Sequence, residues 1–207
     1  HPRKFRFGVQ LATAKDGADW AATARRYEDL GFSTLFLPDH FGDQLAPLPA
    51  MMAAADATTE LRVGCLVFDN DFKHPVGLAK EIATVDVLSG GRVEFGLGAG
   101  WLNTDYVQSG IVKESAGVRI AKMAEALEVC KGLWGEGAFS FKGEHYTISG
   151  RDGMPKPVQR PGPPILIGGG GPKVLGIAAK HADIIGINPS IPSGQVATGR
   201  SAECIVA

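Results

Sequence analysis

Stretches with the pattern of buried β-strands recur along this chain at nearly constant intervals. Apolar runs begin near positions 5, 33, 61 and 92, so successive starts lie 28, 28 and 31 residues apart. Helical patterns separate several of these runs. Strands that alternate with helices indicate βαβ units and a parallel sheet. This interval favours a (β/α)8 barrel over an α+β fold.

Three of the intervening segments have helical apolar spacing. The first is expected at residues 17–30, with Gly31 as its C-terminal stop. Another opens at Pro75 and ends at the Ser-Gly-Gly run of residues 89–91. Between residues 119 and 134 an apolar side chain recurs every three or four positions, which predicts an amphipathic helix. Its Met, Cys and Trp side chains are interpreted as core residues, because such stripes bury a helix.

The regular alternation breaks after the fourth helix. Residues 138–148 alternate like a small hairpin and residues 149–164 are rich in Pro and Gly, so 136–164 is interpreted as an insertion after strand four. Strand-like runs near 163 and 183 complete about six βα units, whereas a (β/α)8 barrel has eight. Residues 189–207 lack clear periodicity and are expected to form a loop or a truncated end. We predict one domain over 1–207, an apparently incomplete TIM barrel.

An open barrel would expose strand edges and apolar faces, which favours a covering partner. The sequence therefore predicts either a homodimer that covers the gap or further residues that complete the sheet.

Composition excludes several classes of function. The chain is 44% hydrophobic and 21% charged with a net charge of −1, as in ordinary globular domains, and its lysines and arginines are scattered. Nucleic-acid binding is not expected without a basic patch. The apolar runs are too short to span a bilayer, and Arg3 and Lys4 lead directly into a strand-like run without an apolar signal core. We therefore expect no membrane partner and a cytoplasmic location.

No residue spacing suggests a metal site. Cys65, Cys130 and Cys204 are widely spaced and odd in number, which predicts buried thiols rather than a disulfide framework or a zinc site. Asp69 and Asp71 follow the third strand, but without matching ligand spacing they are interpreted as solvated loop acids. We predict that the protein binds no metal.

Four consecutive glycines, Gly168 to Gly171, join a short apolar strand to a segment that begins with Pro172. Glycines let a ligand approach the backbone N–H groups, and a following helix directs its free N–H groups to the same place. Pro172 suits the first helical turn, where its missing N–H costs nothing. This run predicts a phosphate cradle, and the alternative is a flexible loop.

The glycine run does not match the two common nucleotide motifs. A Walker loop ends in Gly-Lys followed by Ser or Thr, but here Gly171 is followed by Pro172 and Lys173. A dinucleotide fingerprint needs a third glycine where Lys173 stands, and the other candidate, at Gly96 and Gly98, has Trp101 at that place. The phosphate therefore remains unidentified by motif.

The carboxyl ends of the predicted strands carry the residues suited to chemistry, as expected for such folds. Strand two ends in Asp39 and His40, and a histidine can move a proton near neutral pH. The alternative is that Asp39 caps a turn and only orients His40. Strand four ends in small residues followed by Trp101, which would let a flat ring lie against the backbone beside an aromatic wall. Close helix packing is the alternative there.

Five segments in this order resemble the luciferase-like monooxygenase superfamily: PDHFG, SGGRVEFGLGAGW, FSFKGEHYTI, PKPVQRPGPPILIGGGGP and HADIIG. Within it, the likeness is to oxidoreductases that use the deazaflavin coenzyme F420, and it covers residues 5–188. The resemblance implies a TIM barrel with an insertion after strand four, usually dimeric, that binds FMN or F420 at its C-terminal face.

The resemblance also implies roles for single residues. Asp39 and His40 would lie beside the cofactor ring, with His40 the best candidate for proton transfer. Leu66 and Val67 match a strand-three bulge where many relatives hold a non-prolyl cis peptide behind the ring. The other wall would consist of Gly98, Ala99, Gly100 and Asn103, and the phosphate site of Gly168, Gly169, Gly170, Gly171 and Pro172.

One departure limits the inference about the substrate. In relatives that oxidise glucose 6-phosphate, a glutamate follows the strand-four glycines, and this chain has Trp101 there. That activity is therefore not expected, and the small organic substrate stays unidentified. The first hypothesis is hydride transfer with F420. The alternatives are an FMN-dependent two-component flavin monooxygenase and a non-catalytic protein that binds a deazaflavin or flavin.

Overall fold

A curled parallel sheet forms the centre of the computed structural model, which describes residues 5–187 and the backbone of residues 205 and 206. Six of its strands lie side by side, and each neighbouring pair among them is parallel. In spatial order they are β1 (Gly8–Gln10), β2 (Thr34–Leu37), β3 (Arg62–Cys65), β5 (Val93–Gly98), β8 (Ile165–Gly169) and β9 (Ile184–Ile187). The six predicted strands are thus confirmed, and in the described part of the chain they form an open half-barrel.

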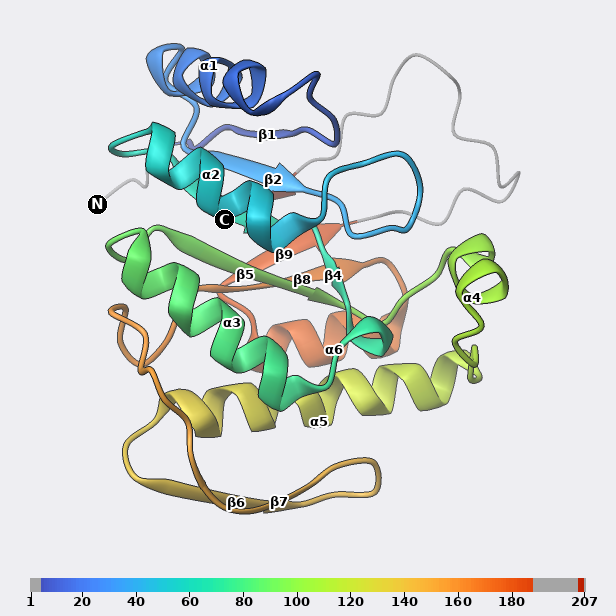
Figure 1. Cartoon of the computed structure of the whole chain (residues 1–207). Coiled ribbons are helices and arrows are strands. Elements are labelled where there is room, and N and C mark those ends of the chain that lie inside the picture. The colour runs from blue at the N-terminus through green and yellow to red at the C-terminus, as the bar shows by residue number, and fades with distance from the viewer. Residues whose placement is uncertain (1–4, 188–204, 207) are drawn as a thin grey trace.

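Helices cover the outer face of this sheet (Figure 1). They are α1 (Gly17–Asp29), α2 (Pro47–Ala57), α3 (Pro75–Leu88), α5 (Ala116–Trp134) and α6 (Pro172–His181). The predicted end of the first helix is confirmed, because Gly31 lies just after α1 with a left-handed φ of 81°. Within the described ranges, no helix combines the length and apolar character needed to cross a bilayer.

Several short elements complete the fold. The turn η1 (Asn70–Phe72) precedes α3, and α4 (Asn103–Ser109) stands beyond the carboxyl ends of the strands (Figure 1). A two-residue strand, β10 (Ile205–Val206), pairs antiparallel with β9. It belongs to the segment expected to be irregular, most of which lies outside the described residues.

The single strand expected to begin near residue 61 consists of two pieces, β3 and β4 (Phe68–Asp69). Between them the backbone bulges at Leu66 and Val67, whose peptide bond is cis, as the family resemblance implies. The bulge brings the chain very close to β5, because a Cβ atom on Gly96 would lie 1.9 Å from the Cys65 carbonyl oxygen. Cys65 is buried and free, as is Cys130, while Cys204 lies outside the described residues.

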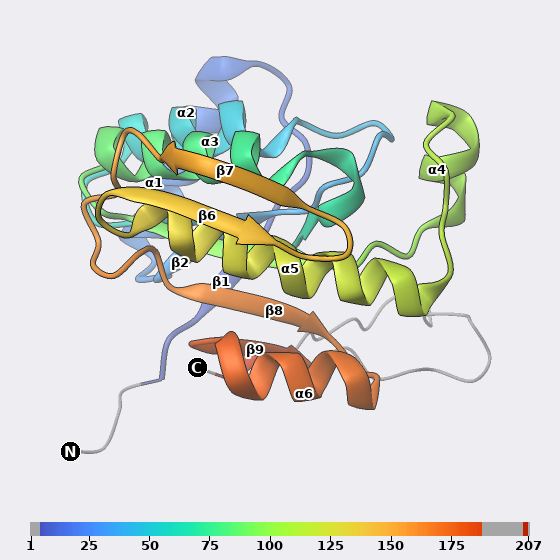
Figure 2. The same cartoon turned by 90° about the horizontal axis from the view of Figure 1, so that it is seen from below.

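The predicted hairpin consists of β6 (Ala138–Lys142) and β7 (Thr147–Asp152), and β7 extends beyond its predicted end at residue 148. Figure 2 shows the hairpin lying across the outside of α5. Glu125 of α5 accepts hydrogen bonds from three successive backbone N–H groups, at residues 144–146, over 2.8 to 3.0 Å. These bonds fasten the hairpin turn to the helix. That residues 136–164, which include this hairpin, form an insertion stays a prediction.

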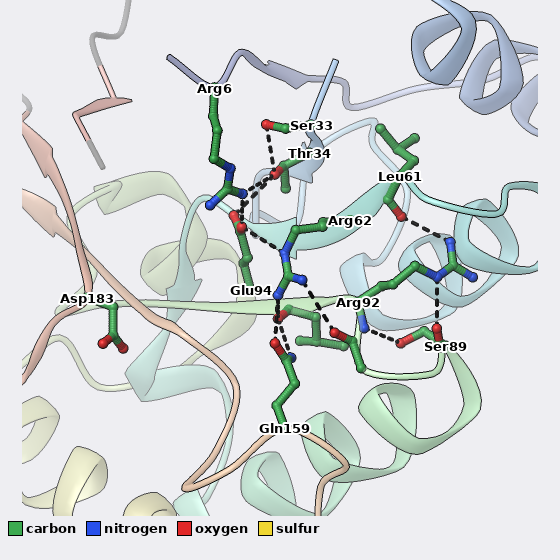
Figure 3. Close-up of polar contacts among 12 residues, drawn as sticks. Arg6, Ser33, Thr34, Leu61, Arg62, Ser89, Arg92, Glu94, Gln159 and Asp183 are labelled. Atoms are coloured by element: carbon green, nitrogen blue, oxygen red, sulfur yellow. Dashed lines mark hydrogen bonds and ion pairs between the residues drawn. The ribbon is translucent and has the colours of Figure 1, made fainter. Parts of the chain in front are cut away.

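A network of charged and polar side chains closes the amino end of the sheet (Figure 3). Glu94, which is 1% exposed, pairs with Arg6 and with Arg62, whose Nε lies 2.9 Å from the Glu94 carboxylate. Arg62 also donates to Gln159 Oε1 over 2.8 Å, which ties the Pro- and Gly-rich connection to the sheet. In barrels this end contributes to stability, whereas chemistry takes place at the opposite end.

Candidate active site

A cavity of about 460 Å³ opens at the carboxyl ends of the parallel strands. Its volume is in the range of protein sites for small molecules and cofactors. Most of the residues predicted for the site line it: Asp39, His40, Leu66, Val67, Gly98, Ala99, Gly100 and Gly168 to Gly171. These residues come from four separate strand ends, and the parallel topology brings those ends to one edge of the sheet.

Two predicted residues lie outside this lining. Asn103 is the first residue of α4 and is exposed. Pro172 is the first residue of α6, directly after the last glycine of the run. The segment that begins with Pro172 is therefore a helix, as expected, and its amino end adjoins the cavity.

At some of the glycines in the cavity wall, neighbouring atoms leave little room for a side chain. A Cβ atom on Gly98 would lie 2.5 Å from Val67 Cγ2, and one on Gly168 would lie 3.2 Å from Val67 Cγ1. A Cβ atom on Gly171, by contrast, would meet nothing within 4 Å. Packing thus accounts for Gly98 and contributes at Gly168, but it does not account for Gly171. A bare wall of this kind fits a flat ring, and the open end of the run fits a phosphate beside the amino end of α6.

His40 is held in place by a residue that the sequence did not reveal. Its Nδ1 lies 2.7 Å from Oδ2 of Asp105, a carboxylate on α4 that is 5% exposed. The other carboxylate oxygen accepts the backbone N–H of Phe41 over 3.3 Å. The Trp101 ring stands edge-on to the imidazole, with the ring centres 5.8 Å apart. His40 is therefore oriented by Asp105. The alternative considered from the sequence, that Asp39 orients His40, is wrong.

Asp39 binds the neighbouring strand. Its carboxylate accepts the backbone N–H of Asp69 over 3.1 Å, which joins the end of β2 to β4. Burial raises the pKa of Asp39, and this hydrogen bond acts in the opposite direction. Asp39 thus both lines the cavity and fixes the strand ends that shape it.

The interpretation of Asp69 as a solvated loop acid is wrong, because its side chain is only 7% exposed and lines the cavity. It accepts the backbone N–H of Asp71 over 2.9 Å and lies 3.2 Å from the Tyr106 hydroxyl, which is also 3.0 Å from Asp71. Burial raises the pKa of Asp69 to about 6, and the nearby Asp71 charge acts in the same direction. Among the described residues, no group of three or more His, Cys, Asp or Glu side chains is arranged to hold a metal ion.

The raised pKa of Asp69 predicts a pH-dependent loss of stability. The pKa of Asp69 is about 6 in the folded protein, above its ordinary value of 3.8. The stabilisation of the folded state by the protonated Asp69 carboxyl is therefore complete below pH 3.8 and is lost as the pH rises through 6. We expect the contribution of Asp69 to the free energy of unfolding to be about 1 to 2 kcal/mol smaller at about pH 7.5 than at about pH 5. Denaturant unfolding of Asp69→Asn should lack this difference, whereas Asp43→Asn, at an exposed acid, should keep it. The same pH dependence in both variants would contradict the assignment.

Arg119 is a second functional candidate that sequence reasoning missed. The sequence marked it only as the start of a helical pattern, yet it is 9% exposed and lines the cavity. Its guanidinium donates to the carbonyl oxygens of Ala99 and Gly100 over 3.0 and 3.2 Å. Gly100 has a φ of 72°, and a Cβ atom there would lie 1.9 Å from the Tyr106 hydroxyl. The turn after β5 is therefore fixed from two sides.

Comparison with known proteins gives a consistent family and fold. The model of the luciferase-like monooxygenase family matches residues 4–201. An F420-dependent glucose-6-phosphate dehydrogenase of Amycolatopsis mediterranei is 29% identical over 173 residues, which cover 80% of this chain and 51% of the relative. The oxygenase component of a flavin-dependent trigonelline monooxygenase of Acinetobacter baylyi is 30% identical over 149 residues, 70% of this chain and 40% of the relative.

A solved structure agrees with this assignment. An F420-dependent secondary alcohol dehydrogenase, in complex with an F420-acetone adduct, superposes with a TM-score of 0.76 and 26% identity. The match covers 86% of this chain and 56% of that one. The chain thus spans about half the length of the proteins that it matches.

Proposed function

The chain belongs to the luciferase-like monooxygenase family, and from this premise we propose that it is an oxidoreductase that transfers a hydride between coenzyme F420 and a small organic substrate. Members of this family are oxidoreductases and monooxygenases, and the half-barrel described above corresponds to part of their TIM barrel. The observation that carries the proposal is the placement of His40, held by Asp105, at the edge of a glycine-walled cavity.

The proposed cofactor site uses both walls of the cavity. When bound, F420 would supply a ring carbon that exchanges a hydride with the substrate. The bulge at Leu66 and Val67 would lie behind the ring, with Asp39 and His40 at its edge. The turn Gly98 to Gly100 would form the opposite wall, and Gly168 to Gly171 would hold the phosphate. Asn103 is left out of this set because it is exposed, and Pro172 serves as the first residue of α6.

His40 is proposed to move the proton. When a hydride leaves a carbon that bears a hydroxyl group, the hydroxyl proton must leave as well so that a carbonyl can form. A neutral imidazole takes such a proton near neutral pH. Asp39 has a fixed partner in the Asp69 backbone, so we assign it to positioning the site.

The choice of F420 over FMN rests on two likenesses, to the dehydrogenase of Amycolatopsis and to the secondary alcohol dehydrogenase structure. The likeness to the trigonelline monooxygenase keeps an FMN-dependent monooxygenase as the second candidate. A non-catalytic cofactor-binding protein is the third. A homodimer and a cytoplasmic location stay predictions.

Cofactor titrations test the proposal. We expect F420 to bind in preference to FMN, measured by the visible absorption of the loaded protein. Gly171→Asp should weaken F420 binding about 10-fold or more, because it places a negative charge beside the phosphate. The variant should still fold, since position 171 precedes a helix in open space and Asp is a favoured residue there.

Gly171→Ser is the matched control, because serine also caps helices but carries no charge. Its affinity for F420 should fall clearly less than that of Gly171→Asp. Tight FMN binding without F420 binding would overturn the first candidate in favour of the second. Retained F420 binding without turnover across a panel of alcohols and carbonyl compounds would favour the non-catalytic protein.

A further inference from the structure

The short helix α4 carries buried side chains to the site although most of it is exposed. It stands beyond the strand ends (Figure 1), and its Val107 is 71% exposed. Asp105 and Tyr106 are its buried residues. Asp105 contacts His40, and the Tyr106 hydroxyl lies within hydrogen-bond distance of Asp69. Polar contacts with the catalytic end of the sheet therefore account for where this helix lies.

An ionised Asp105 carboxylate would determine which nitrogen of His40 carries a proton. An ionised carboxylate can only accept hydrogen bonds, so the 2.7 Å contact with Oδ2 requires a hydrogen on Nδ1 of His40. The Phe41 N–H donates to Oδ1, which fixes the carboxylate plane. Among the described residues, Asp105 is the ion-pair partner of His40. In a neutral imidazole the other nitrogen, Nε2, then has a free lone pair.

We propose that Asp105 is a positioning residue that holds His40 in the tautomer whose Nε2 accepts a proton. The proposal rests on the proposed function and specifies the direction of the reaction, in which an alcohol is oxidised and His40 accepts the proton. Nε2 of His40 would take the proton of a substrate hydroxyl group, and oxidised F420, when bound, would take the hydride from the carbon that bears it, so that a carbonyl group forms. The imidazolium that results keeps its Nδ1–H bond to Asp105, now between opposite charges in a largely buried place.

The variant that separates this role from a structural one is Asp105→Asn. It keeps the size and shape of the side chain, but its amide group can donate to Nδ1 and so select the Nε2–H tautomer. ¹⁵N NMR of the histidine side chains in the cofactor-free protein should show Nδ1–H for neutral His40 in the wild type and Nε2–H in the variant. With F420 and an accepted alcohol, kcat should fall about 10²- to 10⁴-fold with little change in KM.

The control is Glu114→Gln, which removes one negative charge from an exposed side chain in the segment after α4. It should change neither the tautomer nor kcat, and denaturant unfolding should show all three proteins to be folded. An Nε2–H tautomer in the wild type, or full turnover in Asp105→Asn, would overturn the role of Asp105. If no cofactor bound, the proposed function would fail, but the NMR result would still decide the tautomer.

Discussion

Replacing His40 with asparagine is expected to lower the rate of hydride transfer about 10²- to 10⁴-fold, while the affinity for F420 changes little. An asparagine amide can take the place of Nδ1 and keep a donor for Asp105, but it has no group at the position of Nε2. The variant therefore removes the proposed proton acceptor and leaves the buried Asp105 carboxylate with a partner. Turnover of an accepted alcohol and titration with F420 measure the two quantities separately.

The effects of His40 and Asp105 on turnover can be compared with a double variant. If Asp105 acts through His40, the double variant His40→Asn, Asp105→Asn should be no slower than His40→Asn alone, because a group that is already absent cannot be mispositioned. His40→Ala should lose as much turnover, and some stability as well, because it leaves Asp105 without its ring partner. Wild-type turnover in His40→Asn would remove His40 from the mechanism.

Replacing Gly96 with alanine is expected to destabilise the protein by about 3 kcal/mol or more, at or above the upper end of the usual cost of overpacking. The added methyl group would lie 1.9 Å from the Cys65 carbonyl oxygen and 3.2 Å from Val67 Cγ1. The first of these neighbours is backbone, so relief requires the bulge between β3 and β4 to move away from β5. That movement would also displace Leu66 and Val67, which line the cavity.

Gly77→Ala is the matched control for this substitution. Gly77 lies in α3, is exposed, and would place its Cβ atom in open space. Alanine there should stabilise the protein by about 0.5 to 1 kcal/mol, because it favours the helix and restricts the unfolded chain. Urea unfolding of the two variants should shift the midpoint in opposite directions. A wild-type midpoint for Gly96→Ala would mean that the bulge yields easily.

The regular part of the fold could be predicted from the sequence because burial imposes a period on apolar residues. The strands and the helices α1, α3 and α5 all show that period. The helix α4 was not predicted, because it is short and most of its side chains are exposed. Its position depends on Asp105 and Tyr106, whose partners are distant in sequence: His40 and Asp105 are 65 positions apart.

The part of the candidate site that could be predicted is the part whose residues are placed by the sheet topology alone. The ends of parallel strands meet at one edge, so Asp39, His40 and the glycines at residues 98 and 168–171 could be grouped without knowledge of contacts. Asp69 was misjudged because the sequence does not show that the chain folds over it. Arg119 looked like one more residue of an amphipathic helix, and only its bonds to the turn after β5 reveal its place in the cavity wall.

The inner face of β5 explains how the bulge between β3 and β4 can lie so close to this strand. Alternate residues of a strand face the same side, and along this face Glu94 is followed by Gly96 and then Gly98. At Glu94 the barrel interior is filled by the network with Arg6 and Arg62. Beyond it the strand contributes no side chain to the interior. The places that side chains would take at Gly96 and Gly98 are occupied by the Cys65 carbonyl oxygen and by Val67. The step from a carboxylate to two glycines in this one strand is therefore what lets the bulge reach inward, so that Leu66 and Val67 line the cavity.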